Sequence, residues 1–295
     1  FLIALKAYPI KQKGKIIIGY LQSNKIVISS ADRGAHIVLK FLNKIRNKKE
    51  LYYFVIGGAL YNNIIEKKWD VNVYKDINKI YVEANTLKEN LRLININNVE
   101  VLNNFRKINK FKNNYIKKQD IRFVFWGRVI KEKGIEEAIR LINRLNKEGY
   151  QCCLDIYGQI KEDYKQDISK MLNQHIVYKG EIRPDNKNEY EILSMYDIFI
   201  LPTEYPGECL PGALIDAYIS ALAVVVSNWK YANEYVRSGE NGIIFEYKNY
   251  EDMYMKTKKM IDENKIQQYK NKSLEMSKEY NIEIILKEFN KRIVE

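Results

Sequence analysis

Apolar runs rich in β-branched and aromatic residues alternate with amphipathic stretches along the whole chain. In the first part, this alternation predicts strands at 25–29, 51–56, 79–83 and 99–102, and helices at 33–48 and 86–94. After residue 119 it predicts strands at 122–126, 152–157, 176–178, 198–201 and 224–227, and helices at 135–147, 162–172, 188–195, 211–221 and 282–293. Strands that alternate with helices favour parallel sheets covered by helices. We therefore expect an α/β fold with two doubly wound, Rossmann-like domains.

The stretch 103–119 is polar, rich in Lys and Asn, and only weakly periodic. We interpret it as a linker between a first domain at 1–110 and a second at 119–280, with 281–295 as a terminal helix. A long exposed loop within a single domain would show the same pattern. In open α/β sheets, ligands bind at the carboxyl ends of the strands. The loops after Trp126, Tyr157, Tyr178 and Leu201 are therefore the candidate binding loops.

The loop after Trp126 carries Gly127 and Arg128, followed by Lys133 and Gly134. Glycine allows a ligand to approach the backbone closely, while Arg offers a planar fork for phosphate oxygens and Lys a mobile point charge. Five residues apart in one loop, Arg128 and Lys133 can converge on a single diphosphate. Taken alone, the same residues are also typical of a solvated surface loop.

The loop after Leu201 leads through Glu208 to Pro211, which we expect in the first turn of the next helix. A helix start offers backbone N–H groups and a partial positive charge to an anion. Asp216 follows Glu208 by eight positions, so both carboxylates can reach a ligand and accept hydrogen bonds from sugar hydroxyls. The alternative is that Glu208 only complements the helix dipole and Asp216 is an ordinary acid on a solvated face.

Composition narrows the classes of function. Hydrophobic residues make up 46% and charged residues 29% of the chain, which is typical of globular domains. No apolar run approaches the roughly 18–20 residues of a membrane helix. Three cysteines, two of them adjacent, and two scattered histidines suit neither a disulfide framework nor a metal site, so we expect no metal and a reducing cytoplasm.

The net charge of +12 is unevenly distributed. Residues 1–120 hold 23 Lys and Arg against 9 Asp and Glu, a surplus of 14, whereas residues 121–295 hold 26 against 28. A basic half indicates an anionic partner, either nucleic acid or an anionic membrane face. Because no nucleic-acid-binding motif is present, we expect no nucleic acid. AT-rich coding, which biases surfaces toward Lys, Asn and Ile, would produce the same surplus.

The second half resembles glycosyltransferase family 4, the retaining enzymes of the GT-B fold, and in particular its bacterial capsule and O-antigen polysaccharide-assembly members. The resemblance rests on several short motifs in the family's order: Phe125–Arg128 with Lys133-Gly134, Leu154–Gly158, Tyr178–Ile182, Asp197–Thr203, the Glu208-x7-Asp216 element, and Asn241–Phe245. Each motif alone is weak evidence for the family, but the ordered set is specific to it.

The resemblance implies a metal-independent hexosyltransferase that uses a UDP- or GDP-linked sugar as donor, with no separate cofactor. Arg128 and Lys133 would bind the donor diphosphate beside Gly127, and Glu208 would contact the donor sugar. Asp216 would bind the ribose, and Ile182 would lie near the base. The backbone from Leu210 through Pro211 and Gly212 would complete the phosphate cradle. With Arg128, Lys133 and Glu208 as catalytic residues, the sugar would pass to a glycan or polyprenyl-linked acceptor.

In the first half the resemblance is looser. Tyr53–Gly58 resembles a strand and cleft loop of the family, which implies that Gly57 and Gly58 lie on the acceptor side. Relatives begin with a further strand and Gly-rich loop that would precede Phe1, so we expect the first domain to be truncated at its start. The terminal helix would pack back across that domain. The protein would be cytoplasmic and peripheral on the inner face of the plasma membrane.

Two departures from the family pattern bear on the site. The family usually has Glu where this chain has Asp216, so the side chain is shorter by one methylene, and Ala221-Leu222-Ala223 stands where Gly-x-Pro is usual. Two other functions remain open: a nucleotide-sugar epimerase of the same fold, and a catalytically silent subunit that only binds the nucleotide sugar.

Overall fold

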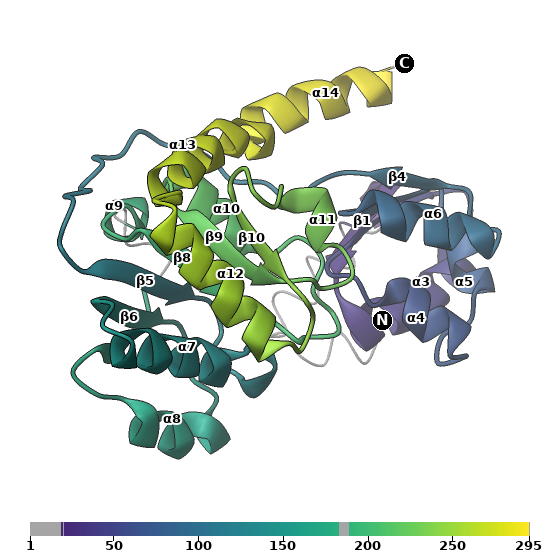
Figure 1. The fold of residues 1–295 in the computed structure, drawn as a ribbon. Coiled ribbons are helices and arrows are strands. Elements are labelled where there is room, and N and C mark those ends of the chain that lie inside the picture. Colours follow the sequence, from purple (N-terminus) through teal and green to yellow (C-terminus); the bar gives the residue numbers. More distant parts are fainter. Residues whose placement is uncertain (1–18, 20, 183–188, 295) are drawn as a thin grey trace. The chain divides into compact units, whose positions relative to one another are not determined.

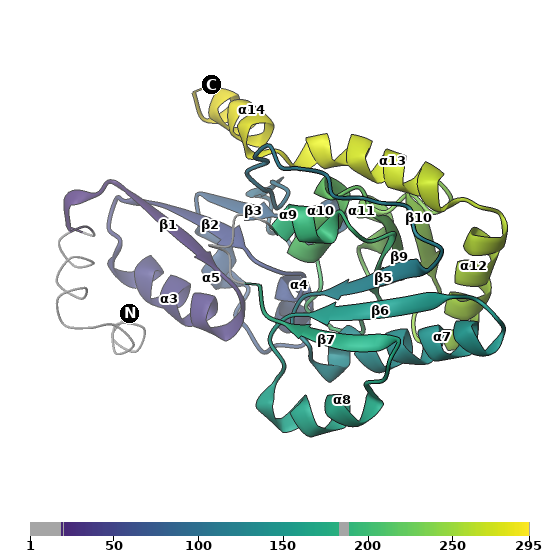
Figure 2. The same cartoon turned by 90° about the vertical axis from the view of Figure 1, so that its left-hand side faces the viewer.

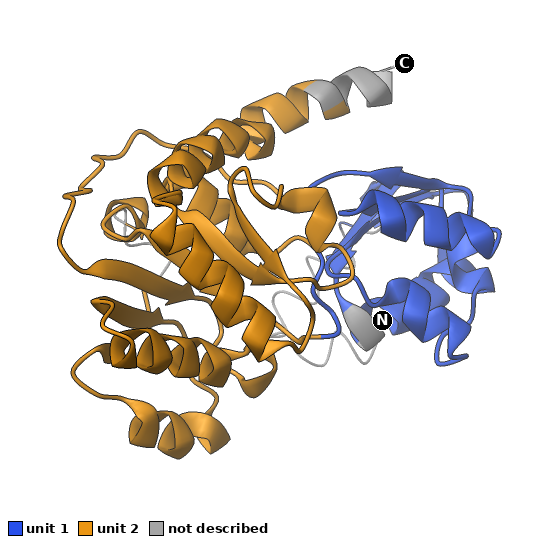
Figure 3. Cartoon of the chain, in the orientation of Figure 1, with its two compact units in different colours: residues 1–103, 206–209 blue, residues 104–205, 210–295 orange. Residues whose placement is uncertain are grey.

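The computed structural model describes residues 19, 21–182 and 189–294, and the chain divides into two compact units (Figure 3). Unit 1 comprises Phe1–Asn103 and Pro206–Cys209, and unit 2 comprises Asn104–Tyr205 and Leu210–Glu295. Within the described ranges, no helix is both long and apolar enough to cross a membrane.

Unit 1 is built on a four-stranded parallel sheet. Its strands, in sheet order, are β1 (Lys25–Ser30), β2 (Glu50–Val55), β3 (Lys79–Val82) and β4 (Val99–Val101). Its helices are α3 (Asp32–Ile45), α4 (Leu60–Ile65), α5 (Asn72–Lys75) and α6 (Asn85–Leu93) (Figure 1). The four strands expected from the sequence are confirmed.

Two features of unit 1 differ from the sequence expectation. Helix α3 ends at Ile45, earlier than the expected Lys48, and α4 and α5 were not expected at all. Helices of six and four residues are too short for a helical period to stand out in the sequence. The core face of α3 is regular, with Ala35, Leu39 and Leu42 buried at the i, i+4, i+7 spacing of an amphipathic helix.

Unit 2 is built on a six-stranded parallel sheet. Its strands, in sheet order, are β10 (Gly242–Phe245), β9 (Ala223–Ser227), β8 (Ile198–Leu201), β5 (Ile121–Trp126), β6 (Cys152–Tyr157) and β7 (Ile176–Gly180). Its α-helices are α7 (Ile135–Lys147), α8 (Lys165–Met171), α9 (Glu189–Leu193), α10 (Gly212–Ile219), α11 (Ala232–Tyr235), α12 (Tyr250–Asp262), α13 (Ile266–Met276) and α14 (Ile282–Val294). Short 3-10 turns lie at Lys131–Lys133, Glu162–Tyr164 and Ser277–Tyr280.

The sheet of unit 2 is covered on both faces (Figures 1 and 2). Phe123 and Phe125 of β5 face a core shared with α7 and α12, whereas helices α10 and α13 pack against β9 and against each other. Because side chains alternate along a strand, Val124, which is also fully buried, faces away from that core. A strand buried on both faces must be apolar throughout, which explains the continuous runs in the sequence. The α/β fold expected from the sequence is thus present in both units.

Candidate functional site

The winding of unit 2 reverses between two neighbouring strands of its sheet. Strands β5 and β8 are neighbours in the sheet. The chain continues from β5 into α7 and from β8 toward α10, and these two helices pack on opposite faces of the sheet. Such a reversal of winding direction opens a crevice outside the strand ends, where doubly wound proteins bind ligands. The loops after Trp126 and Leu201 flank that position, as expected from the sequence.

The two loops are held against each other by backbone contacts. The Glu204 amide donates to the Glu132 carbonyl at 2.7 Å. Gly134 has a φ of +74°, and a Cβ atom there would lie 2.0 Å from the Pro202 carbonyl oxygen. Only glycine fits that conformation and that approach. Gly134 therefore both caps the amino end of α7 and allows the two loops to meet.

Arg128 and Lys133 converge on the same aromatic ring. The Arg128 guanidinium carbon lies 5.3 Å and the Lys133 ammonium nitrogen 5.4 Å from the ring centre of Tyr205. Arg128 is exposed, and the preceding Gly127 is fixed because its amide donates to the Tyr157 carbonyl at 3.1 Å. The structure thus brings the two predicted cations together at the sheet edge, with a ring beside both that sequence reasoning had not singled out.

Asp216 is buried, with 8% of its surface exposed. Arg106 Nε donates to its Oδ1 at 2.7 Å, and Trp126 Nε1 donates to its Oδ2 at 3.2 Å. Burial raises the pKa of Asp216, and hydrogen bonds from Arg106, Trp126 and Tyr190 oppose that rise. The alternative of an ordinary acid on a solvated face is therefore wrong.

The amino end of α10 differs slightly from expectation. Pro211 precedes the helix as its N-cap residue, with φ −61° and ψ 127°, and Gly212 is the first helical residue. Pro211 is therefore not in the first turn, although its carbonyl oxygen accepts from the Leu214 amide at 3.0 Å. Leu210 is buried, and its carbonyl oxygen accepts from the Asn104 side chain at 3.3 Å. These contacts fix the direction in which the helix start points.

Glu208 and the two glycines of the expected acceptor side lie together within unit 1. Glu208 is buried and belongs to the short segment Pro206–Cys209 of that unit. The Gly58 amide donates to the Gly207 carbonyl at 3.1 Å, and a Cβ atom on Gly57 would lie 2.9 Å from the same oxygen. A larger residue at position 57 would push this segment away.

The remaining predicted residue, Ile182, is half-buried just after β7. Residues 183–188, which follow it, lie outside the described residues. Among the described residues, no group of three or more His, Cys, Asp or Glu side chains could hold a metal ion.

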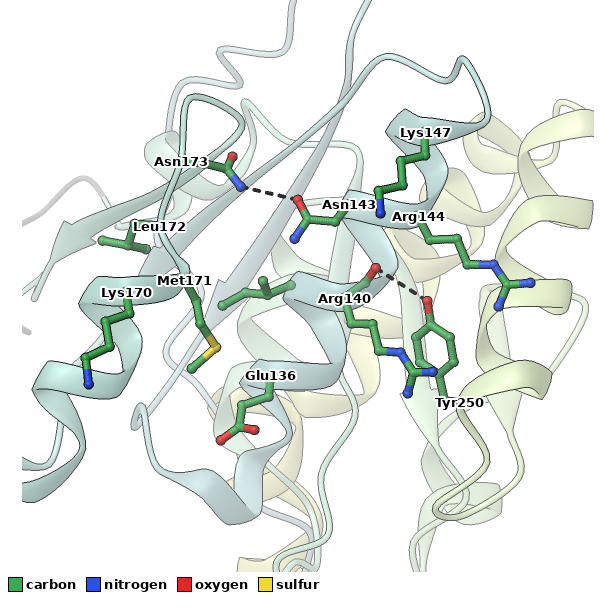
Figure 4. A pocket seen from close by; sticks show the side chains of 11 residues that line it. Glu136, Arg140, Asn143, Arg144, Lys147, Lys170, Met171, Leu172, Asn173 and Tyr250 are labelled. Carbon is green, nitrogen blue, oxygen red and sulfur yellow. Dashed lines mark hydrogen bonds between the residues drawn. The ribbon is translucent and has the colours of Figure 1, made fainter.

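A pocket of about 720 Å³ lies elsewhere on unit 2 (Figure 4). It is lined by α7, the end of α8 and Tyr250, and none of the predicted site residues contributes to its wall. Two of its cations are already engaged, because Arg140 stacks on Tyr250 and Arg144 pairs with Glu251 at 2.7 Å. We therefore place the candidate site at the carboxyl edge of the sheet and not in this pocket.

Sequence reasoning missed Arg106, which contacts Asp216 from the polar stretch 103–119. One signal was available: Arg106 is the single arginine in a stretch with five lysines, 103–119. A planar guanidinium is the cation best suited to a buried carboxylate. The Trp126 contact had no comparable signal, because an aromatic residue at a strand end is common.

Comparison with known proteins agrees with the motif order. The family profile described as "Glycosyl transferases group 1" matches residues 106–279. An uncharacterized glycosyltransferase of Methanocaldococcus jannaschii is 30% identical over 231 residues, which cover 77% of this chain and 53% of that protein. The capsular polysaccharide biosynthesis glycosyltransferase CapM of Staphylococcus aureus is 25% identical over 166 residues, 54% of this chain and 42% of CapM. The chain thus spans about half the length of these relatives.

Solved structures show the same fold. Anabaena HepE, crystallised with UDP-glucose, matches with a TM-score of 0.77 at 13% identity, covering 97% of this chain and 84% of HepE. S. aureus TarM matches with a TM-score of 0.72 at 19% identity, covering 94% of this chain and 56% of TarM. This likeness confirms the GT-B fold expected from the sequence. Because the matched profile spans more than half of the chain, the protein belongs to the glycosyl transferases of group 1.

Proposed function

We propose that this protein transfers a sugar, with retention of anomeric configuration, from a nucleoside diphosphate donor to a glycan or polyprenyl-linked acceptor in cell-surface polysaccharide synthesis. The observation that carries the proposal is the convergence of Arg128 and Lys133 on Tyr205 at the sheet edge. Two cations in one loop, next to a helix start, match the charge of a diphosphate. The capsular role in the name of CapM supports the polysaccharide assignment.

The proposed chemistry is the departure of a diphosphate. As the bond between the sugar and the diphosphate breaks, negative charge grows on the leaving oxygen. Cations held in place beforehand stabilise that charge without having to reorganise. We assign this role to Arg128 and Lys133, the donor sugar to Glu208, and the ribose to Asp216. UDP is the first donor nucleotide to test, because the HepE and TarM crystals contain UDP or UDP-glucose.

Product analysis tests the proposal. The protein is incubated with isotopically labelled UDP-sugars and with lipid-linked and oligosaccharide acceptors, and the products are identified by mass spectrometry and NMR. We expect release of UDP that depends on the acceptor, together with an α-linked product from an α-linked donor. Glu208→Gln should lower turnover by about 10²-fold, the scale of losing one electrostatic stabiliser, with little change in UDP affinity.

Other products would contradict the transferase proposal. Conversion of the donor sugar into its epimer without a new glycosidic bond would identify an epimerase. Tight nucleotide-sugar binding without turnover, across all donors and acceptors tried, would identify a silent binding subunit.

We further propose that the protein binds the inner face of the plasma membrane through its basic half. The support is the surplus of 14 positive charges in residues 1–120. Each Lys or Arg close to an anionic surface contributes about 1 kcal/mol. Flotation with liposomes should recover the protein with phosphatidylserine vesicles at low salt, and much less at high salt or with phosphatidylcholine alone. Equal recovery with both lipids would refute membrane binding by charge.

A further inference from the structure

The backbone of Arg106 is fixed by a segment near the end of the chain. Its amide donates to the Tyr280 carbonyl at 2.9 Å, and its carbonyl accepts from the Ile282 amide at 2.9 Å. These two bonds form a parallel bridge between Arg106 and Asn281. Although Arg106 lies in a polar stretch outside any helix or strand, its position relative to the sheet edge of unit 2 is therefore defined.

The guanidinium of Arg106 lies against the first turns of α10. Its Nε donates to Asp216, and its Nη1 donates to the Phe105 carbonyl at 3.1 Å. A Cβ atom built on Gly212 would lie 2.0 Å from Nη2, so any larger residue there would displace the guanidinium. Gly212 and Asp216 are one helical turn apart and share a face of α10. The absence of a side chain at Gly212 is what lets Arg106 reach Asp216.

The carboxylate of Asp216 is thereby held from two sides. Arg106 binds one oxygen and Trp126 the other, at 2.7 Å and 3.2 Å. Tyr190 also donates to this carboxylate, and since each carboxylate oxygen offers about two lone-pair sites, these three hydrogen bonds leave a site for a hydroxyl group of a ligand. Glu189 of α9 lies near Asp216 as well, and it is a half-buried group of like charge. Arg106 is the cation that balances this group.

We propose that Arg106 is the positioning residue of the donor site: it keeps Asp216 ionised and turned so that the carboxylate accepts hydrogen bonds from the ribose hydroxyls of the donor. The inference rests on the proposed function, in which Asp216 binds the ribose. It also explains how an aspartate can serve where a glutamate is usual. Since Arg106 and Trp126 fix the position of the shorter carboxylate, its reach depends on them.

Calorimetric titration with UDP and with 2′-deoxy-UDP tests this inference, with GDP and 2′-deoxy-GDP as the second pair. The wild-type protein should prefer the ribonucleotide by about 10-fold or more, the scale of a hydrogen bond to a charged group. Arg106→Gln and Asp216→Asn should each abolish that preference, and the double variant should lose nothing further, because both changes remove the same interaction. Arg106→Lys, which keeps the positive charge but not the planar guanidinium group, should retain part of the preference for the ribonucleotide.

A pH series separates positioning from a merely structural role. In Arg106→Gln, Asp216 faces Glu189, Tyr190 and Trp126 without a cation, so it should hold its proton to higher pH. The preference for UDP over 2′-deoxy-UDP that Arg106→Gln loses should then return as the pH is raised. Arg144→Gln is the matched control, because it breaks an arginine–carboxylate pair with Glu251 outside the site, and it should behave as wild type.

The outcomes distinguish the inference from the proposed function. If the wild-type protein binds none of these nucleotides, the proposed function fails. If it binds UDP or GDP but does not prefer the ribonucleotide, or if Arg106→Gln keeps the full preference, Arg106 does not position Asp216, and the transferase proposal stands. Equal weakening of both nucleotides by Arg106→Gln would mean that Arg106 only supports the fold.

Discussion

Lys270 on α13 is a buried cation whose titration should be visible in the stability of the protein. Its ammonium nitrogen donates to the Tyr196 carbonyl at 2.6 Å and lies 3.7 Å from Asp197 Oδ1 and 3.5 Å from the ring centre of Tyr115. Only 3% of the residue is exposed. Burial lowers the pKa of Lys270 from 10.5 to about 8, against the opposing pull of Asp197.

The sign of the pH dependence follows from proton binding. Between pH 8 and pH 10.5 the unfolded chain holds the Lys270 proton more tightly than the folded one, so the contribution of Lys270 to the free energy of unfolding should rise with pH. With pKa values of about 8 and 10.5, the contribution between pH 7.5 and pH 9.5 is about 2 kcal/mol. Tyr115 has the opposite effect above pH 10. Burial raises its pKa to about 12, so the unfolded chain loses the Tyr115 proton first, and this contribution to the free energy of unfolding falls as the pH rises. The useful window therefore ends near pH 9.5.

The assay is urea unfolding of wild type and Lys270→Met at intervals between pH 7.5 and pH 9.5. The difference between wild type and variant should shift by about 2 kcal/mol in favour of wild type across this window. In Lys259→Met, which removes a side chain that is 72% exposed, the free energy of unfolding should change with pH as it does in wild type. If the Lys270→Met curve also runs parallel, Lys270 is not a desolvated cation and the reasoning is refuted.

Two further predictions concern the site. Gly134→Ala should lower the free energy of unfolding by about 2–4 kcal/mol, because a strained φ adds to a clash with Pro202, whereas Gly149→Ala, at φ +93° with open space, should cost about 1 kcal/mol. Equal losses in urea unfolding would show that the two loops do not depend on their close approach at Gly134. Asp216→Glu should weaken UDP binding by about 10-fold, since the extra methylene displaces a buried carboxylate. Unchanged or tighter binding by calorimetry would show that Arg106 does not fix its position.

The central strands of unit 2 were predictable because β8 and β9, buried along their whole length, have a continuous apolar pattern, whereas β2 of unit 1 alternates half-buried and buried residues. The expected strand at 198–201 is β8, and the expected helix at 135–147 is α7. Strand β10 at Gly242–Phe245 was recognised as a motif but not as a strand. Its run of large apolar residues is only Ile243–Phe245, shorter than the four of β8, so the pattern is weaker.

The contacts of the candidate site were less predictable than its position. The order of motifs placed Arg128 and Lys133 in one loop, and chain connectivity alone requires them to be near each other. The partner of Asp216 lies 110 positions earlier, in a polar stretch that is only weakly periodic, so no local pattern could indicate the contact. The same holds for Tyr205, which meets both cations only because Gly134 brings the two loops together.

Calorimetric titration of UDP into the wild-type protein and into the Arg128→Ala and Lys133→Ala variants tests the central claim most directly. Arg140→Ala, which removes a cation from the wall of the other pocket, is the control. We predict that wild type and Arg140→Ala bind alike, while each of the other two variants binds about 10–150-fold more weakly, as expected for the loss of a charge-assisted hydrogen bond. Unchanged UDP affinity in both Arg128→Ala and Lys133→Ala would contradict the account, because the two cations would then be no more than surface residues of the loop.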